Sequence, residues 1–314
     1  MIDLRRLRVL RAVAHYGTVT GAAKALHFTP SAASQQLRQL GRELGVTLLE
    51  PQGRRVQLTA AARSLLAHAD AIEAQWEQAE IDLRSAGDEP AGQLRVGAFP
   101  TAVSMLLAPA VAAAQATHPR LTVEVREVEP DVGFDQLFEG TLDLAIIEVT
   151  TSNPSMGDTR FDQQPLLDDP FDLVVNAEHR LAGRDGIALT EAADEPWIMS
   201  LPASACHGQI VSACTAAGFT PTIAHHALEW HAIAHLVAYG LGIALVPRLA
   251  YLAPHLPLVR VPLCGDPGPR RKLLTCTRSG ARSSPAVAAV ATELERVAKL
   301  AGDRVANTAA PLLH

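Results

Sequence analysis

Residues 30–44 carry side chains whose types and spacing suit chemistry on a nucleic acid. The spacing is i, i+3, i+4, i+7 and i+11, which places the side chains on one face of a helix. They are Ser31, Ser34, Gln35, Arg38 and Arg42. This face offers hydroxyls, an amide and guanidinium groups, and no carboxylate. Such groups donate hydrogen bonds to phosphates and to base edges in a DNA major groove, so we predict that the face binds DNA.

The formal charge is distributed unevenly along the chain. The 314 residues together carry −6, but residues 1–58 hold nine basic and three acidic side chains and so carry +6. The rest of the chain therefore carries −12. A basic head on an acidic body is typical of a nucleic-acid-binding domain fused to another domain, although a solvated basic surface would give the same charge.

The periodicity of the head predicts the helices that position this face. Leucines at helical spacing from residue 4 predict a first helix that ends near Gly17. Thr18 or Thr20 caps a second helix. A third begins at Pro30, which suits a first helical turn, and ends at Gly45. Its apolar stripe is formed by Ala33, Leu37, Leu40 and Leu44.

A basic turn follows the third helix. Short strands at 47–49 and 56–58 flank residues 51–55, so the segment predicts a β-hairpin whose tip bears Arg54 and Arg55. Close helices followed by a basic hairpin favour a winged helix-turn-helix, with the hairpin at the DNA backbone or minor groove.

The head resembles the LysR-type transcriptional regulators over residues 7–59, LRVLRAVAHYGTVTGAAKALHFTPSAASQQLRQLGRELGVTLLEPQGRRVQLT. Four residues depart from the family pattern: Gly41, Leu49, Pro51 and Ala62. Pro51 replaces a basic side chain, so we assign it no DNA contact. The resemblance and the helix face together predict these DNA-binding residues: Thr29, Ser31, Ser34, Gln35, Arg38, Arg42, Arg54 and Arg55. We expect the arginines to bind phosphates, and Ser34 and Gln35 to read bases.

Residues 59–86 contain neither Gly nor Pro and predict one long helix. Its apolar positions recur at helical spacing: Leu65, Leu66, Ala69, Ile72, Trp76, Ala79 and Leu83. A 58-residue head cannot cover a helix of this length, so the stripe is expected to pair with another chain, the alternative being packing within the chain. The resemblance implies an antiparallel helix pair in a dimer. Residues 87–92 are expected to be a hinge.

Strands and helices alternate from residue 93, which implies parallel sheets covered by helices. The predicted strands are 94–98, 121–128, 142–147, 171–176, 196–200, 222–228, 242–246 and 271–277. The predicted helices are 101–117, 131–139, 204–217, 229–239 and 283–300. The expected fold is α+β multidomain: the winged helix-turn-helix (1–58), the linker helix and hinge (59–92), and a two-lobed α/β effector-binding domain (93–300). The lobes are about 93–165 plus 271–300, and 166–270; a tail (301–314) follows. The two lobes resemble the periplasmic-binding-protein-like effector domain of the family.

Ligands in such folds bind where strand carboxyl ends and helix N-termini face the cleft. This rule predicts the effector-binding residues Phe99, Pro100, Thr101, Glu129, Glu148, Ser200, Ser204, His207, Glu229, Trp230 and Val246. Each of them is equally suited to end a strand or cap a helix. Because Glu148 and Glu229 are acidic, the charge of the effector stays open.

Other chemistries have weaker support. His231 and His235 have the i, i+4 spacing of a metal-binding pair but no HExxH motif, so we predict no metal and no cofactor. Cys206 and Cys214 lie too far apart on one helix to form a disulfide, whereas redox sensing through Cys206 stays open. The GxSxG, P-loop and GxGxxG motifs are absent, so we do not expect an enzyme. The uncharged stretch 96–119 contains three prolines and fits a buried strand and helix better than a membrane span.

We therefore expect a cytoplasmic transcriptional regulator, because arginines stand where a signal peptide needs an apolar run. Its expected partners are partly palindromic double-stranded DNA, a small-molecule effector, and further copies of itself in a homodimer or homotetramer. RNA polymerase is a candidate partner, and no membrane is expected. The alternative is a small-molecule binding protein whose head serves only in assembly.

Overall fold

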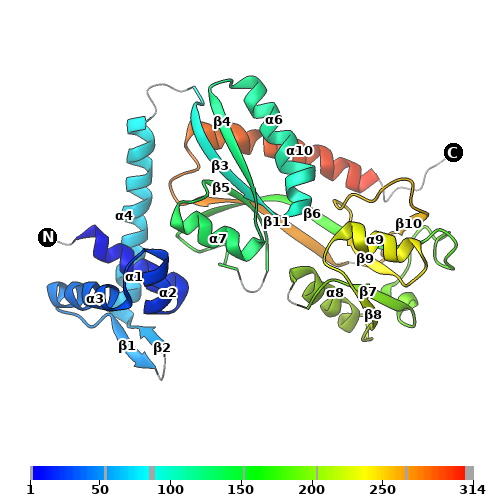
Figure 1. Cartoon of the computed structure of the whole chain (residues 1–314), viewed down its shortest axis with the longest axis horizontal. Coiled ribbons are helices and arrows are strands. Elements are labelled where there is room, and N and C mark those ends of the chain that lie inside the picture. The colour runs from blue at the N-terminus through cyan, green and yellow to red at the C-terminus, as the bar shows by residue number, and fades with distance from the viewer. Residues whose placement is uncertain are drawn as a thin grey trace.

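The computed structural model describes residues 3–52, 55–84, 89–150, 153–202, 204–265 and 268–307. The chain forms a small helical head, one long helix and a two-lobed α/β body (Figure 1). The elements of the head are α1 (Leu4–Tyr16), α2 (Val19–Ala25), α3 (Pro30–Leu44), β1 (Leu49–Gln52) and β2 (Arg55–Leu58).

Local signals at the helix ends explain the bounds of the head helices. The Thr18 side chain accepts a hydrogen bond from the Gly21 amide and so caps α2, as predicted. Pro30 occupies the first turn of α3, behind a capping Thr29. Gly45 ends α3 at a φ of 67°, a conformation that glycine adopts without strain. The apolar stripe faces inward, since Ala33, Leu37 and Leu40 are all buried and Leu44 is partly buried.

The helix α4 (Ala60–Arg84) occupies most of the predicted segment 59–86. Its first half completes the core of the head, because Ala62 and Ala69 are buried there. Its second half exposes apolar surface: Trp76 is 50% and Leu83 is 83% exposed. The head therefore covers the predicted apolar stripe as far as Ala69, and beyond Ala69 several side chains of the stripe are exposed to solvent.

A seven-stranded sheet runs through both lobes in the order β10-β6-β11-β5-β3-β4, with β9 paired to β6. Its strands are β3 (Gly92–Ala98), β4 (Leu121–Glu127), β5 (Leu144–Glu148), β6 (Phe161–Asn176), β9 (Ala244–Pro247), β10 (Leu258–Val261) and β11 (Arg270–Arg278). Strand β3 is parallel to β4 and β5, whereas β11 is antiparallel to β5 and β6. The long strands β6 and β11 cross from one lobe to the other (Figure 1).

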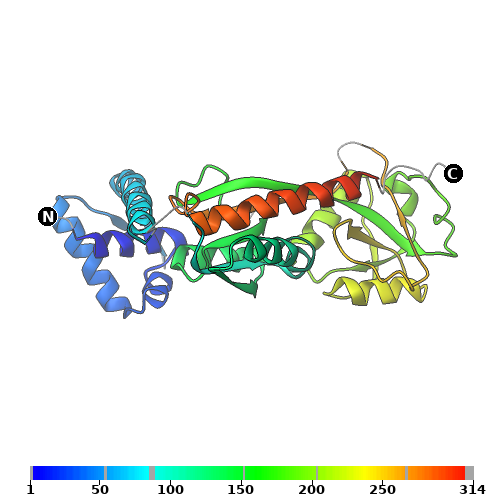
Figure 2. The same ribbon diagram turned by 90° about the horizontal axis from the view of Figure 1, so that it is seen from above.

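We call the lobe of β3, β4 and β5 lobe I and the other lobe II. The helices of lobe I are α5 (Pro100–Ala102), α6 (Ala108–Thr117), α7 (Pro130–Glu139) and α10 (Pro285–Asn307). Lobe II adds a parallel pair, β7 (Pro196–Met199) and β8 (Thr222–His226), with α8 (Ala205–Ala216), α9 (Trp230–Ala238) and a short 3₁₀ turn (Leu189–Ala192). Helices α6 and α10 lie side by side over lobe I (Figure 2).

A π-helical stretch, Val103–Leu107, joins α5 to α6. Pro109 lies in the first turn of α6 and has no amide hydrogen, so it cannot continue the α-helical hydrogen bonds of the preceding turn. The whole stretch Pro100–Thr117 is long and apolar enough to cross a membrane, a criterion that core helices of soluble proteins also meet. Here it packs in the core of lobe I against Val290 and Leu294 of α10.

The structure corrects several predicted bounds. Strand β6 begins at Phe161, ten residues before the predicted strand 171–176. The prediction missed these ten residues because Pro165, Pro170 and several polar side chains interrupt the apolar alternation there. Strand β10 has no counterpart among the predicted strands. Helix α10 extends to Asn307, so the first part of the predicted tail is helical.

Candidate DNA-reading face and effector cavity

The predicted DNA-binding side chains of α3 lie together on the outside of the head. Ser31, Gln35, Arg38 and Arg42 are exposed and Ser34 is half-buried, opposite the buried apolar stripe. Arg42 donates to Gln39 Oε1 at 2.6 Å. The Thr29 hydroxyl accepts from the Ala32 amide at 3.2 Å and contacts the Ser31 hydroxyl at 3.0 Å, so it orders the start of the helix.

The hairpin after α3 has the predicted antiparallel form, with Leu49 opposite Leu58 and Gln52 opposite Arg55. Its first strand starts two residues later than the predicted 47–49. Arg54 lies outside the described residues, and of Arg55 only the backbone is described. The backbone of Arg55 places that residue at the start of β2, next to the turn of the hairpin.

A cavity of about 1510 Å³ lies between the two lobes. Side chains from lobe I, from lobe II and from the crossing strand β11 line it. The cavity brings together nine of the predicted effector-binding residues: Phe99, Pro100, Thr101, Glu129, Glu148, Ser200, Ser204, Glu229 and Trp230. Thr101 lies in the first turn of α5, and Ser204 caps α8, so two helix N-termini face the same space.

Two predicted residues do not line this cavity. The side chain of His207 turns back to its own lobe, where Nδ1 lies 2.9 Å from the carbonyl oxygen of Ser200. Val246 lies on β9, which pairs with β6, and its side chain is fully buried in a core cluster of lobe II. At these two positions the strand-end and helix-end rule does not select a residue that lines the cavity.

The cavity also contains polar residues that the rule does not predict, among them Gln209, Arg271, Thr150, Asn153 and Ser212. Arg271 stands near the amino end of β11. Since β11 is antiparallel to β5, its amino end lies at the same sheet edge as the carboxyl end of β5. Gln209 lies just over one helical turn after the capping Ser204. Two signals would have found these residues. For Arg271 it is the antiparallel direction of the crossing strand, and for Gln209 it is the second turn of a helix that faces the cleft.

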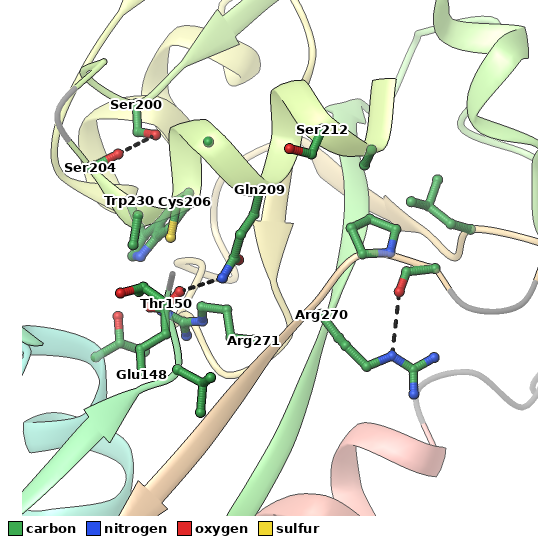
Figure 3. A pocket seen from close by; sticks show the side chains of 18 of the residues that line it. Glu148, Thr150, Ser200, Ser204, Cys206, Gln209, Ser212, Trp230, Arg270 and Arg271 are labelled. Carbon is green, nitrogen blue, oxygen red and sulfur yellow. Dashed lines mark hydrogen bonds and ion pairs between the residues drawn. The ribbon is translucent and has the colours of Figure 1, made fainter. Parts of the chain in front are cut away.

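Glu148, Gln209 and Arg271 form a polar group that joins the lobes (Figure 3). Gln209 Nε2 from lobe II donates to Glu148 Oε1 from lobe I at 2.8 Å. Arg271 Nη1 lies 4.0 Å from Glu148 Oε2, and Arg271 is held by Asp169 at 2.5 Å. Glu148 is only 3% exposed. Burial raises the pKa of Glu148, against the opposing effects of Arg271 and Gln209.

One buried acceptor in this group has no partner among the described residues. It is Gln209 Oε1, at the lobe boundary beside Glu148. A buried polar atom without a hydrogen bond is costly. Gln209 lines the cavity, but its Oε1 is buried, so a ligand donor would reach this acceptor only if the side chain turned.

Cys206 and Cys214, the two cysteines of α8, show little of the character of redox sensors. Burial raises the pKa of Cys206 to about 12 and that of Cys214 to about 11, so neither thiol is readily deprotonated. All four cysteines are free. In the described part of the chain no three His, Cys, Asp or Glu side chains gather in a way that could hold a metal ion.

Comparison with known proteins identifies the two parts of the chain. Residues 4–63 match the family model "Bacterial regulatory helix-turn-helix protein, lysR family", and residues 87–299 match "LysR substrate binding domain". Among curated proteins the chain is 31% identical to the HTH-type transcriptional regulator AlsR of Bacillus subtilis, over 79% of this chain and 82% of that protein. It is 32% identical to a probable hydrogen peroxide-inducible genes activator of Streptomyces viridosporus, over 89% of both chains.

Solved structures agree with this match. An H2O2-bound variant of Corynebacterium glutamicum OxyR superposes with a TM-score of 0.63 at 25% identity, over 99% of this chain and 97% of that one. Full-length CbnR in complex with its target DNA has the same fold, with a TM-score of 0.56 at 22% identity over 95% and 100%. The fold agrees with these matches, since the chain has a helix-turn-helix head and a two-lobed body with a cavity between the lobes. The chain belongs to the LysR-type family of transcriptional regulators.

Proposed function

We propose that this LysR-type regulator binds double-stranded DNA through the exposed face of α3 and through the hairpin β1-β2, and that a small molecule in the inter-lobe cavity controls it. The proposal rests on one observation: the same chain has a carboxylate-free polar helix face and a large cavity between its two lobes. The domain limits that we assign are 1–58 for the reader, 59–92 for the linker and 93–300 for the effector domain.

On DNA we assign base reading to Ser34 and Gln35, and phosphate binding to Arg38, Arg42, Arg54 and Arg55. Ser31 and Thr29 lie at the amino end of α3, where a helix inserted in the major groove approaches the bases most closely. Guanidinium groups supply affinity that depends on salt, and the amide of Gln35 supplies discrimination.

The division of labour on α3 is testable by substitution in the full chain. Gln35→Ala should lower the preference for the specific site over random DNA by about 1–3 kcal/mol. Arg38→Ala should weaken binding to both DNAs and reduce the slope of log affinity against log salt by about 1. Arg184→Ala is the control, because it removes the same charge from an exposed ion pair in lobe II. Equal losses on both DNAs for both α3 variants would contradict the assignment.

For the effector we infer a small polar molecule with at least one hydrogen-bond donor. Gln209 lines the cavity, and a turn of its side chain would present the unpartnered Oε1 to a ligand; apolar walls are available from Phe99 and Trp230. A thermal-shift screen of metabolites tests this: binders should raise the melting temperature of the wild type, and Gln209→Leu should weaken those that carry a donor.

Peroxide sensing is a second candidate function, because several relatives are hydrogen peroxide-inducible genes activators. The raised thiol pKa of Cys206 and its 9% exposure disfavour it, since the thiolate is the reactive form. An unchanged DNA footprint after treatment with H2O2 would exclude this function, and a footprint that changes in the wild type but not in Cys206→Ser would establish it.

The exposed apolar residues of α4, among them Ile72, Trp76 and Leu83, favour self-association into a dimer or a dimer of dimers. A two-fold dimer accounts for a partly palindromic DNA site. We place the regulator in the cytoplasm, with RNA polymerase as a further partner. The alternative, a binding protein whose head only assembles, predicts no salt-dependent DNA affinity in the full chain.

A further inference from the structure

The carboxyl end of α1 contacts lobe I of the same chain, far from the DNA-reading face. His15 and Tyr16 meet α7: His15 Nε2 lies 2.6 Å from Asp135 Oδ1, and the Tyr16 hydroxyl donates to Glu139 Oε1 at 2.7 Å. Figure 1 shows α7 on the side of lobe I that faces the head. The head is thus joined to the body at a second place besides the chain connection through α4.

His15 stands at the centre of this contact. Its ring stacks on Phe138 with centroids 4.3 Å apart and 7° between the planes. Arg160 Nη1 lies 2.6 Å from His15 Nδ1. Because a guanidinium only donates, Nδ1 must accept, so Nε2 carries the hydrogen and donates to Asp135. This pattern requires the neutral imidazole, and the side chain is only 6% exposed.

The linker helix is part of the same contact. Asp70 of α4 accepts from Arg11 Nε of α1 at 2.6 Å and from the Thr159 hydroxyl of lobe I at 3.2 Å. Further along α4, Glu77 accepts from Arg278 Nη2 at 2.7 Å. Three parts of the chain, α1, α4 and lobe I, are therefore held by charged groups of which several are largely buried.

The two crossing strands connect this contact to the effector cavity. Strand β6 starts at Phe161, directly after Arg160, and strand β11 ends at Arg278. In the sheet Arg278 is the register partner of Phe161, and Arg271 in the cavity is that of Asp169. The same strand pair therefore extends from the effector cavity to the residues that hold the head.

We propose that the surface of lobe I around Asp135, Phe138 and Arg160 is a docking site for the head's own first helix, and that this docked state restrains the head until the effector or acid releases it. The proposal goes beyond the function given above, and the docking holds whichever effector the cavity takes. The occupant is the α1 helix of the same chain, seated by an aromatic stack, two hydrogen bonds of one imidazole and the Tyr16 hydroxyl.

Acid sensitivity follows from the groups around His15. They are Arg11 of α1, Asp70 of α4, Asp135 and Glu139 of α7, and Asp158 and Arg160 before β6. Burial, and after it Arg160, lowers the pKa of His15, and Asp135 opposes both effects. The docked state thus favours the neutral ring. Docking is at full strength above the pKa of free histidine, about 6.5, and weakens as the pH falls below it.

Hydrogen exchange of the full-length protein, read by mass spectrometry, tests the docking. Relative to wild type at pH 7.5, His15→Phe keeps the stack on Phe138 but removes both hydrogen bonds, and Arg160→Met removes the cation. Each variant should speed exchange in α7 and in the last turns of α1 by roughly tenfold, the equivalent of one charge-assisted hydrogen bond. Wild type at pH 5.5, corrected for intrinsic rates, should change in the same two peptides.

The matched control is Arg180→Met, which breaks a half-exposed ion pair with Glu195 in lobe II. It should leave α1 and α7 unchanged. Wild-type exchange in α1 and α7 for both His15→Phe and Arg160→Met would overturn the proposal, as would an equal increase in α8, which would mean general destabilisation. Protection of α7 that grows with protein concentration would assign the contact to a second chain and would also overturn it.

Discussion

Asp169→Asn should destabilise the effector domain strongly, because it breaks a buried ion pair on one side only. Asp169 is 0% and Arg271 is 2% exposed. The carboxylate accepts from Arg271 at 2.5 and 3.1 Å and from the Leu249 amide at 2.9 Å. The asparagine fills the same space but carries no charge, so that among the described residues Glu148, at 4.0 Å, is the carboxylate left near the guanidinium.

The expected loss is about 3–5 kcal/mol, the cost of leaving a buried charge without its partner. With a urea slope of about 2 kcal/mol/M, the unfolding midpoint should fall by about 1.5–2.5 M. Urea titration at pH 7.5 measures this, followed by the fluorescence of the fully buried Trp197 in lobe II. The protein should still fold, since domain stabilities are about 5–15 kcal/mol.

A double variant separates the unpaired charge from lost packing. In Asp169→Leu with Arg271→Met both charges are gone and the volume is nearly kept, so the double variant should be more stable than Asp169→Asn. The reasoning is refuted if Asp169→Asn costs less than about 1 kcal/mol, or if the double variant loses as much as the two single variants added together.

Three further predictions concern the cavity and the linker. Glu148→Gln should be more stable than wild type at pH 8, because burial raises the pKa of Glu148. The advantage should shrink as the pH falls and Glu148 of the wild type takes up a proton, and a growing advantage in urea titrations would contradict this. At pH 8 iodoacetamide should modify exposed Cys264 before Cys206, and peptide mapping that finds the reverse order would refute the buried-thiol argument. Gly280→Ala places a Cβ 2.3 Å from a carbonyl oxygen of α4, so it should speed hydrogen exchange in α4, whereas Gly183→Ala meets nothing within 4 Å; equal exchange in the two variants would contradict the close packing.

The head could be predicted from the sequence because its signals are local. Thr18, Pro30 and Gly45 mark helix ends within a few residues, and the 3.6-residue period separates the inner face of α3 from the outer one. The amino-terminal part of β6 could not be predicted, because Pro165 and Pro170 imitate a loop although the strand is paired along its length.

Many of the residues that line the cavity could be predicted from strand ends and helix starts, but Arg271 and Gln209 at its polar centre could not. Predicting Arg271 requires knowing that β11 runs antiparallel to β5. Predicting Gln209 requires knowing that α8 faces lobe I across the cavity. Only the tertiary fold defines both. The contacts of His15 were also beyond prediction, since its partners Asp135 and Arg160 are 120 and 145 residues away in the chain.

A DNase I footprint on the DNA that flanks this protein's own gene tests the central claim most directly. The account predicts a protected, partly palindromic region whose affinity falls steeply with salt and which Gln35→Ala makes indistinct. Protection with no sequence preference, or a footprint that Gln35→Ala and Arg38→Ala both leave unchanged, would contradict the claim that the α3 face reads DNA.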